Sequence, residues 1–142
     1  MEVTTRGEEP VPYGFEVSGL VPADCQTVYQ AWMSSEAHSA MTRGEAHIDP
    51  VVGGSFRAWG DYIWGTTQEL EPFRRIVQSW RTQNFTDSDA DSRIEVIFEP
   101  EGENTLVRVV HTNVPDGDVG YEQGGWTRSY FEPMKEYFAA RR

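Results

Sequence analysis

The stretch GGWTRSYFEPMKEYF, residues 124–138, combines a helical pattern with five aromatic rings. At about 100° per residue, its large apolar side chains fall on one broad stripe and its charged side chains on the other side. The stripe consists of Trp126, Tyr130, Met134 and Tyr137, widened by Phe131 and Phe138, and the opposite side carries Arg128, Glu132, Lys135 and Glu136. Such a face requires a large apolar surface opposite it, and a curved antiparallel sheet supplies one. Pro133 removes one backbone hydrogen bond, so we expect a kink that lets the helix follow the sheet.

Between residues 43 and 113 the sequence has the short alternating pattern and the turn residues that are typical of strands. Three of the expected strands lie at 74–83, 93–100 and 104–114. Glycine, proline and aspartate mark the connections, because they permit positive φ or end a strand. The expected turns and strand ends lie at Gly53-Gly54, Gly60-Asp61, Pro72 and 101–104. Because these connections are short, the sheet should be mostly antiparallel.

The segment before residue 43 predicts one strand followed by two helices. Residues 13–20, YGFEVSGL, alternate apolar with polar or small side chains, as a strand does. Asp24 and Ser34 are good helix-capping residues, and they predict short helices over 24–33 and 34–42.

The order of these elements predicts the fold class. It is an α+β helix-grip fold, in which a curved antiparallel sheet of about six to seven strands wraps around a long C-terminal helix. Two short helices follow the first strand. We expect residues 13–142 to form a single domain of this kind, preceded by a flexible N-terminal arm over residues 1–12.

Two motifs carry a resemblance to a known family. The first is TRGEAHIDPVVGGSFRAWGDYIWGTTQELEPFRRIVQSWR, residues 42–81, and the second is GWTRSYFEPMKEYF at the end. With them the chain resembles the START-like (SRPBCC) superfamily and, more closely, the C-terminal domain of the activator of the heat-shock-protein-90 ATPase. The matching positions are Thr42-Arg43, Asp49-Pro50, Gly53-Gly54, Phe56, Gly65, Leu70, Pro72, Ile76-Val77, Trp80-Arg81, Gly125-Trp126, Arg128, Tyr130-Phe131-Glu132, Lys135 and Phe138.

The resemblance covers roughly residues 13–138 and implies a START-like helix-grip fold. It also implies a heat-shock-protein-90-type chaperone as a partner, whose ATPase such a co-chaperone would modulate. From the 142 residues we expect no separate N-terminal domain of the kind that the eukaryotic co-chaperone carries. No motif for the family's chaperone contacts is found, so the resemblance assigns no contact residue here.

The formal net charge of −11 narrows the classes of partner. Nucleic acids and anionic membrane surfaces both require a basic footprint, so we expect neither as a partner. An acidic face could instead meet a basic patch on another protein. No segment approaches the apolar length of a membrane span and no signal sequence is visible, so we expect a cytoplasmic protein.

The histidines and the single cysteine predict no metal or cofactor site. His38, His47 and His111 have no metal-binding spacing, so we interpret them as structural or surface residues. Cys25 can form no intramolecular disulfide, and without a nearby base we expect it to be inert. We therefore predict no catalytic residue, no metal and no cofactor.

Two other groups of charged residues are candidates for a calcium site and for catalysis. The run DSDADS, residues 87–92, begins like a calcium loop, but it has Ser92 where the loop requires glycine and Phe98 where it requires glutamate. We interpret it as a solvated loop tip. Some START-like proteins are cyclases or hydrolases, and in that alternative the candidate residues are Asp61, Glu69 and Arg81.

The large apolar side chains lead to the main functional hypothesis. It is that the chain is a non-enzymatic protein that binds a small apolar molecule between the sheet and the C-terminal helix. The candidate cavity residues are Trp32, Met41, Phe56, Trp64, Trp80, Trp126, Tyr130 and Met134. The alternative for each of these side chains is that it fills the core. The second functional hypothesis is the co-chaperone, and we expect a monomer or a weak homodimer in either case.

Overall fold

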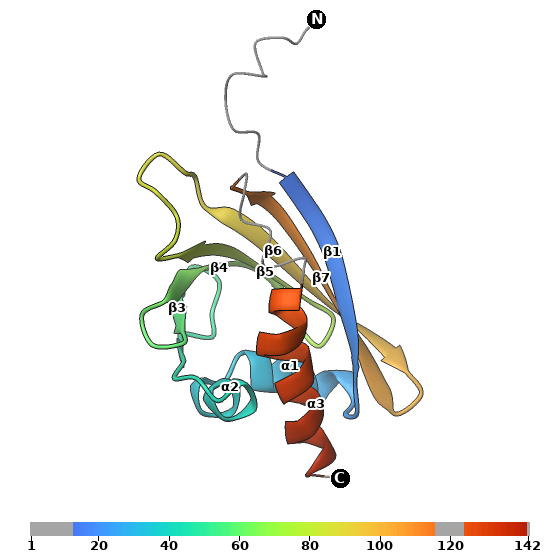
Figure 1. Ribbon diagram of the computed structural model, residues 1–142. Coiled ribbons are helices and arrows are strands. Elements are labelled where there is room, and N and C mark those ends of the chain that lie inside the picture. Colours follow the sequence, from blue (N-terminus) through green and yellow to red (C-terminus); the bar gives the residue numbers. More distant parts are fainter. Residues whose placement is uncertain (1–12, 116–123, 142) are drawn as a thin grey trace, which may run out of the picture.

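The structure is a computed structural model that describes residues 13–115 and 124–141. Seven strands form one antiparallel sheet that curves around the C-terminal helix (Figure 1). The strands are β1 (Tyr13–Val21), β2 (His47–Ile48), β3 (Ser55–Ala58), β4 (Ile63–Glu71), β5 (Arg75–Thr82), β6 (Ser92–Glu101) and β7 (Asn104–Val114). Their order across the sheet is β1-β7-β6-β5-β4-β3-β2. The predicted helix-grip fold is therefore confirmed, and the arm predicted over residues 1–12 lies outside the described residues.

The two short helices begin at the predicted caps. The side chain of Asp24 accepts a hydrogen bond from the Thr27 N–H at 2.8 Å and begins α1 (Cys25–Trp32). The Ser34 hydroxyl accepts one from the Ala37 N–H at 3.2 Å and begins α2 (Ser35–Thr42). Each cap satisfies a backbone donor that the first helical turn leaves without a partner. In Figure 1 both helices lie at one end of the sheet, beside the C-terminal helix.

The C-terminal helix begins with a wide turn. A π-helical segment, η3 (Thr127–Phe131), precedes α3 (Glu132–Ala139), and the Glu132 N–H bonds to the carbonyl five residues earlier, at Thr127. Pro133 has no N–H, and in a regular α-helix its ring would crowd the carbonyl of Ser129. Widening the turn relieves that crowding. The irregularity expected at Pro133 therefore lies in the turn immediately before it.

Most of the predicted turns are present, but the connection between β3 and β4 differs from the expected two-residue turn. The Tyr62 N–H does bond to the Trp59 carbonyl at 3.2 Å around Gly60-Asp61. The ladder, however, resumes only at the pair Ala58 and Ile63, so the loop has four residues. Trp59 and Gly60 both adopt positive φ, of 55° and 68°.

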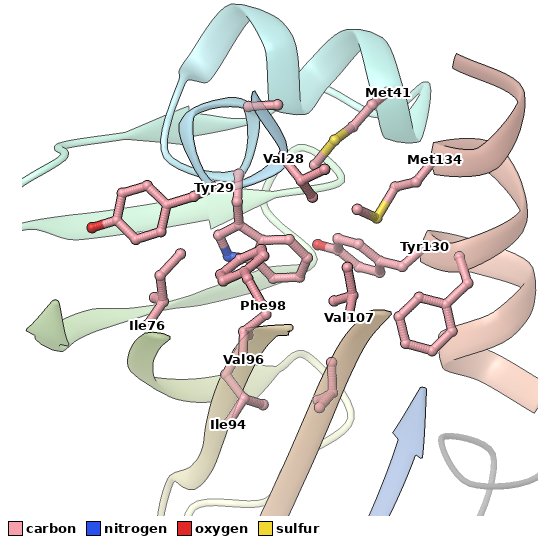
Figure 2. Packing of buried hydrophobic residues seen from close by; sticks show 14 of the residues in the cluster. Val28, Tyr29, Met41, Ile76, Ile94, Val96, Phe98, Val107, Tyr130 and Met134 are labelled. Atoms are coloured by element: carbon pink, nitrogen blue, oxygen red, sulfur yellow. The ribbon is translucent and has the colours of Figure 1, made fainter. Parts of the chain in front are cut away.

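The core lies between the concave face of the sheet and the three helical segments. Figure 2 shows side chains from both sides meeting there: Met41 points from α2 and Met134 from α3 toward the same interior, and Tyr130 reaches from η3 toward the strands. The outer face of the sheet is charged instead. Arg75 pairs with Glu69 and Arg108 pairs with Glu16 on that face.

Candidate functional site

A cluster of four large rings forms the centre of the core beneath the C-terminal helix. Trp126 lies 5.0 Å from Trp80 and 4.9 Å from Tyr130, measured between ring centroids, and Tyr130 stacks on Trp32 at 5.1 Å. All four side chains are buried. Contacts between aromatic rings at these separations contribute about 0.5–1.5 kcal/mol each beyond the burial of apolar area. The cluster therefore fixes the start of the helix against the sheet.

The polar atom of Trp126 is satisfied by a buried chain of hydrogen bonds. Its Nε1–H donates to Nδ1 of His111 at 3.2 Å, and Nε2 of the same imidazole lies 2.9 Å from Oγ of Ser92. Ser92 donates in turn to the carbonyl of Trp80 at 2.6 Å. Because an indole N–H can only donate, Nδ1 of His111 must be the acceptor and Nε2 must carry the proton of the neutral ring.

A second chain satisfies the hydroxyl of Tyr130. Nδ1 of His38 lies 2.8 Å from the backbone carbonyl of Trp32, which can only accept, so Nδ1 carries the proton. Nε2 of His38 then accepts from the Tyr130 hydroxyl at 3.1 Å. The third ring is held in the same way, because Nε1–H of Trp32 donates to Oε1 of Gln78 at 3.3 Å.

Burial keeps both histidines neutral. Desolvation lowers the pKa of His111 to about 3, and it lowers the pKa of His38 to about 4, although the hydrogen bond to the Trp32 carbonyl opposes the shift at His38. A protonated His111 would also present an N–H to the N–H of Trp126. The two residues are therefore buried structural acceptors for the aromatic rings, a role that the sequence interpretation of structural or surface histidines did not specify.

A cavity of about 450 Å³ opens beside this cluster, between the β3–β4 loop and the start of the C-terminal helix. Buried rings of Trp80, Trp126 and Tyr130 form its floor. Its outer part is polar, with the exposed side chains of Arg128 and Ser129 on the helical side. Among the residues that the structure describes, the lining is Trp59, Tyr62, Ile63, Trp80, Asn84, Gly125, Trp126, Arg128, Ser129 and Tyr130.

Trp59 is a lining residue that the sequence reasoning missed. Its φ of 55° lies in the left-handed region, which is unusual for a bulky side chain. Its ring packs against the backbone of Gly44, where an added Cβ would lie only 2.3 Å from Cε3 of Trp59. The signal in the sequence was the adjacent Gly60-Asp61 turn, but a turn motif does not show that the residue before it is left-handed.

Tyr62, Asn84, Arg128 and Ser129 were also missed as lining residues. The Asn84 side-chain amide donates to the Tyr62 hydroxyl at 2.6 Å, so these two side chains support one another at the rim. Arg128 lies on the polar side of the helix in the sequence pattern, yet in the structure it lines the cavity together with Tyr130.

The eight predicted cavity residues separate into three groups. Trp80, Trp126 and Tyr130 line the cavity. Four others are buried in the core without lining it: Trp32, Met41, Phe56 and Met134. Trp64 lies apart from all of them, 37% exposed on the outer face of the sheet, where it pairs across strands with Arg57 and Arg81.

The three charged residues considered for catalysis are not brought together. Asp61 pairs with Arg57 at 2.9 Å, and Glu69 pairs with Arg75 at 2.7 Å. Arg81 donates to backbone carbonyls of the loop that follows β5 and to Asp91. Each of the three is engaged on the outer face or in a turn, away from the cavity lining.

The guanidinium of Arg81 also organises the loop that contains the acidic run at residues 87–92. Its guanidinium donates to the carbonyls of Thr86 at 2.7 Å and Asp89 at 2.8 Å, while the Asp89 carboxylate accepts from the Thr86 N–H. An arginine therefore occupies the point where the oxygens of this loop converge. Within residues 13–115 and 124–141, no three His, Cys, Asp or Glu side chains are arranged to hold a metal ion.

A second, larger groove of about 840 Å³ lies between α1, the β6–β7 turn and the end of α3. None of the eight predicted residues lines it. Its walls combine apolar side chains such as Ala23 and Phe138 with the polar side chains of Asp24, Gln30, Glu103 and Arg141, and it lacks the floor formed by Trp80, Trp126 and Tyr130. Among the helices that the structure describes, none is long and apolar enough to cross a membrane.

Comparison with known proteins identifies the family of this chain. Residues 22–139 match the family model described as Activator of Hsp90 ATPase homolog 1-like protein. An activator of 90 kDa heat shock protein ATPase homolog from Dictyostelium discoideum is 27% identical over 112 residues, which are 78% of this chain and 29% of that protein. The human homolog 1 is 24% identical over 113 residues, 80% of this chain and 33% of the human protein. The chain thus spans about a third of the length of these curated relatives.

Solved structures support the fold. An HSP90 activator from Plasmodium falciparum superposes with a TM-score of 0.80 at 20% identity, covering 89% of this chain and 96% of that chain. The Aha1 dimer from Colwellia psychrerythraea gives a TM-score of 0.72 at 17% identity, covering 88% and 95%. At these identities the likeness establishes the fold alone.

Proposed function

The chain belongs to the family of Activator of Hsp90 ATPase homolog 1-like proteins, and we propose that it is a binding protein that holds a small apolar ligand. The site is the cavity between the β3–β4 loop and the start of the C-terminal helix. The observation that carries this proposal is its floor of three buried rings, Trp80, Trp126 and Tyr130, beside an open volume of about 450 Å³.

The chemistry of the walls supports an apolar ligand. A volume of this size lies within the range of about 300–1,000 Å³ that is typical of small-molecule sites. The hydrogen bonds of Trp126 and Tyr130 are satisfied by His111 and His38, so these rings are held in place before a ligand arrives. A preformed site avoids the entropic cost of ordering its side chains upon binding.

The lining also favours binding over catalysis. Among the described residues, no His, Asp, Glu or Cys side chain lines the cavity, and the hydroxyls of the lining residues Tyr62 and Tyr130 are hydrogen-bonded to Asn84 and His38. The charged side chain among the described lining residues is Arg128, whose guanidinium donates hydrogen bonds and can bind or orient a molecule. We therefore propose a binding role for this site.

The experiment that tests the proposal is native mass spectrometry of the protein purified gently from its host. A retained low-mass molecule near one equivalent is the expected result. The matched control is Ser129→Trp, because Ser129 is exposed on the cavity wall and a large ring there should fill the opening without disturbing the core. A ligand retained equally by both proteins would place binding elsewhere and overturn the proposal for this cavity.

A second candidate function comes from the relatives. Several are named activators of the 90 kDa heat shock protein ATPase, and the net charge of −11 suits a basic surface on a partner protein. On this proposal the chain binds a heat-shock-protein-90-type chaperone and modulates its ATP turnover. The test is the ATPase rate of such a chaperone with added protein, at low and high salt. A rate that stays unchanged at both salt concentrations would exclude this function for the chaperone used.

Three further properties are proposed with either function. We propose that residues 13–142 act as one domain, since a single sheet and one core connect its described segments. We propose a monomer or a weak homodimer, for which the Colwellia psychrerythraea dimer is a precedent in the same fold. We propose a cytoplasmic location. Light scattering across a concentration series tests the oligomeric state, and fractionation of host cells tests the location.

A further inference from the structure

We propose that the cavity selects a flat aromatic carboxylate, with the ring on the aromatic floor and the carboxylate at Arg128. This inference rests on the proposed binding function and deepens it by naming the class of ligand. The cavity has an apolar interior and a polar mouth, so it suits a ligand with an apolar body and a polar head group.

The charge preference comes from Arg128. Its side chain is exposed at the cavity, and no carboxylate of the described part of the chain pairs with it. The arginines of the outer face differ, because Arg75 and Arg108 each hold glutamates. A guanidinium presents two parallel N–H donors that match a carboxylate, so Arg128 is suited to an anionic head group.

The position of Arg128 is supported by its neighbour. Gly124 has a φ of 119°, and a Cβ added there would lie 2.6 Å from Nη1 of Arg128. Because glycine has no Cβ, Gly124 leaves the space that the guanidinium of Arg128 occupies. Arg128, Ser129 and Tyr130 of the wide turn η3 all line the cavity, and π-helical turns of this kind are frequent at functional sites.

The preference for a flat body comes from the rings. Trp80 and Trp126 lie 5.0 Å apart with their planes tilted by 38°, and Tyr130 lies 4.9 Å from Trp126 with a tilt of 42°, so the floor consists of three packed rings that are inclined to one another. Trp59 adds a further ring from the opposite loop, with an unusual left-handed backbone. Flat π systems gain more from such walls than flexible chains of the same area, because they lose less conformational freedom.

The test compares two probes of the same shape, 2-naphthoate and the neutral 2-naphthylmethanol, by titration calorimetry at neutral pH. Three proteins are used: the wild type, Arg128→Gln and the control Arg74→Gln. Arg74 is exposed in the β4–β5 turn, at the end of β5 remote from Trp80, and its substitution changes the net charge equally.

We expect the wild type to bind naphthoate about three- to tenfold more tightly than the alcohol, as for a charge-assisted contact that is partly exposed to solvent. Arg128→Gln should abolish this difference through a weaker affinity for naphthoate, whereas Arg74→Gln should retain it. High salt should reduce the preference in the wild type.

Equal affinities for the two probes in the wild type, or an equal loss in both variants, would overturn the charge preference while leaving apolar binding intact. Binding of neither probe would overturn the cavity's binding function together with the preference. Urea midpoints of the three proteins accompany the titrations. They should coincide, because neither arginine side chain is buried.

Discussion

Nε1 of Trp126 donates a hydrogen bond to Nδ1 of His111 across 3.2 Å, and this bond joins the start of the C-terminal helix to strand β7. The imidazole is fully buried. The sheet and the helix therefore share a polar contact within a mostly apolar interior, and the geometry of the cavity floor depends on it.

Substitution of His111 by alanine should destabilise the protein strongly. The change leaves the Trp126 N–H and the Ser92 hydroxyl without this partner and creates a cavity, so we expect a loss of about 2–4 kcal/mol in the free energy of unfolding. Urea denaturation measures it. The control is His47→Ala, because His47 is exposed and pairs only with the neighbouring Glu45, and its effect should stay within about 0.5 kcal/mol. Similar losses in both variants would contradict the assigned role.

Stability should fall as the pH is lowered below about 6.5. The folded protein keeps His38 and His111 neutral, with pKa values of about 4 and about 3, whereas the unfolded chain binds their protons near 6.5. The unfolded state therefore binds more protons over this window, and the free energy of unfolding should drop by on the order of 3 kcal/mol between pH 7 and pH 5.

Urea denaturation across this pH range measures the effect. Carboxylates titrate mainly below the window, so they contribute little to the slope above pH 5. His111→Gln should remove about half of the slope, since one of the two buried titrating groups is then absent. A stability that is flat from pH 7 to pH 5 would show that the imidazoles are not held neutral.

Gly44→Ala should impair the cavity and destabilise the fold by similar amounts. A Cβ at this position would meet the ring of Trp59, which belongs to a surface loop and can move away. We expect the free energy of unfolding to fall by only about 1 kcal/mol. The affinity for 2-naphthoate should fall about two- to tenfold, the worth of one aromatic contact. Calorimetry and urea denaturation measure the two quantities, and a loss of stability with unchanged affinity would exclude Trp59 from the site.

Arg81→Met should loosen the loop between β5 and β6. Arg81 anchors this loop through the carbonyls of Thr86 and Asp89, and we expect a loss of about 1–3 kcal/mol together with faster proteolysis within residues 83–91. The control Arg57→Met removes a more exposed pair with Asp61 and should have little effect. Calcium should not raise the melting temperature of the wild type, and a clear calcium-dependent rise would contradict the arginine-filled loop.

The fold could be predicted from the sequence because its signals are local. The stripe of Trp126, Tyr130 and Met134 required an apolar surface, and Asp24 and Ser34 begin the helices that they predicted. Each of these patterns depends on residues within one or two turns of chain. The family motifs then supplied the arrangement of the sheet, and the match over residues 22–139 confirms the family.

The site was harder to predict because its features are not local. Trp64 and Ile63 are adjacent, and which of them faces the core depends on the register of β4, since neighbouring side chains in a strand point to opposite faces. The partners His111 and His38 lie far in sequence from Trp126 and Tyr130. No pattern within a segment reveals such pairs, so the rings appeared in the sequence as interchangeable cavity candidates.

Arg128 and Trp59 were missed for a related reason. Ideal helical geometry places Arg128 opposite the apolar stripe, yet its side chain, in the π-helical turn before Pro133, lines the cavity. Trp59 depends on a left-handed backbone that its own side chain disfavours. The π-helical turn and the left-handed Trp59 both lie at the cavity. Functional sites are the places where a structure is expected to depart from the geometry that local sequence patterns predict.

The measurement that tests the central claim most directly is a nuclear magnetic resonance titration of the five indole N–H signals with 2-naphthoate. The cavity account predicts saturable shifts for Trp59, Trp80 and Trp126, which line the cavity, and no shift for Trp64 on the outer face. Ser129→Trp should abolish these shifts while leaving the fold intact. An absence of saturable shifts in the wild type, or shifts centred on Trp64, would contradict a ligand site in this cavity.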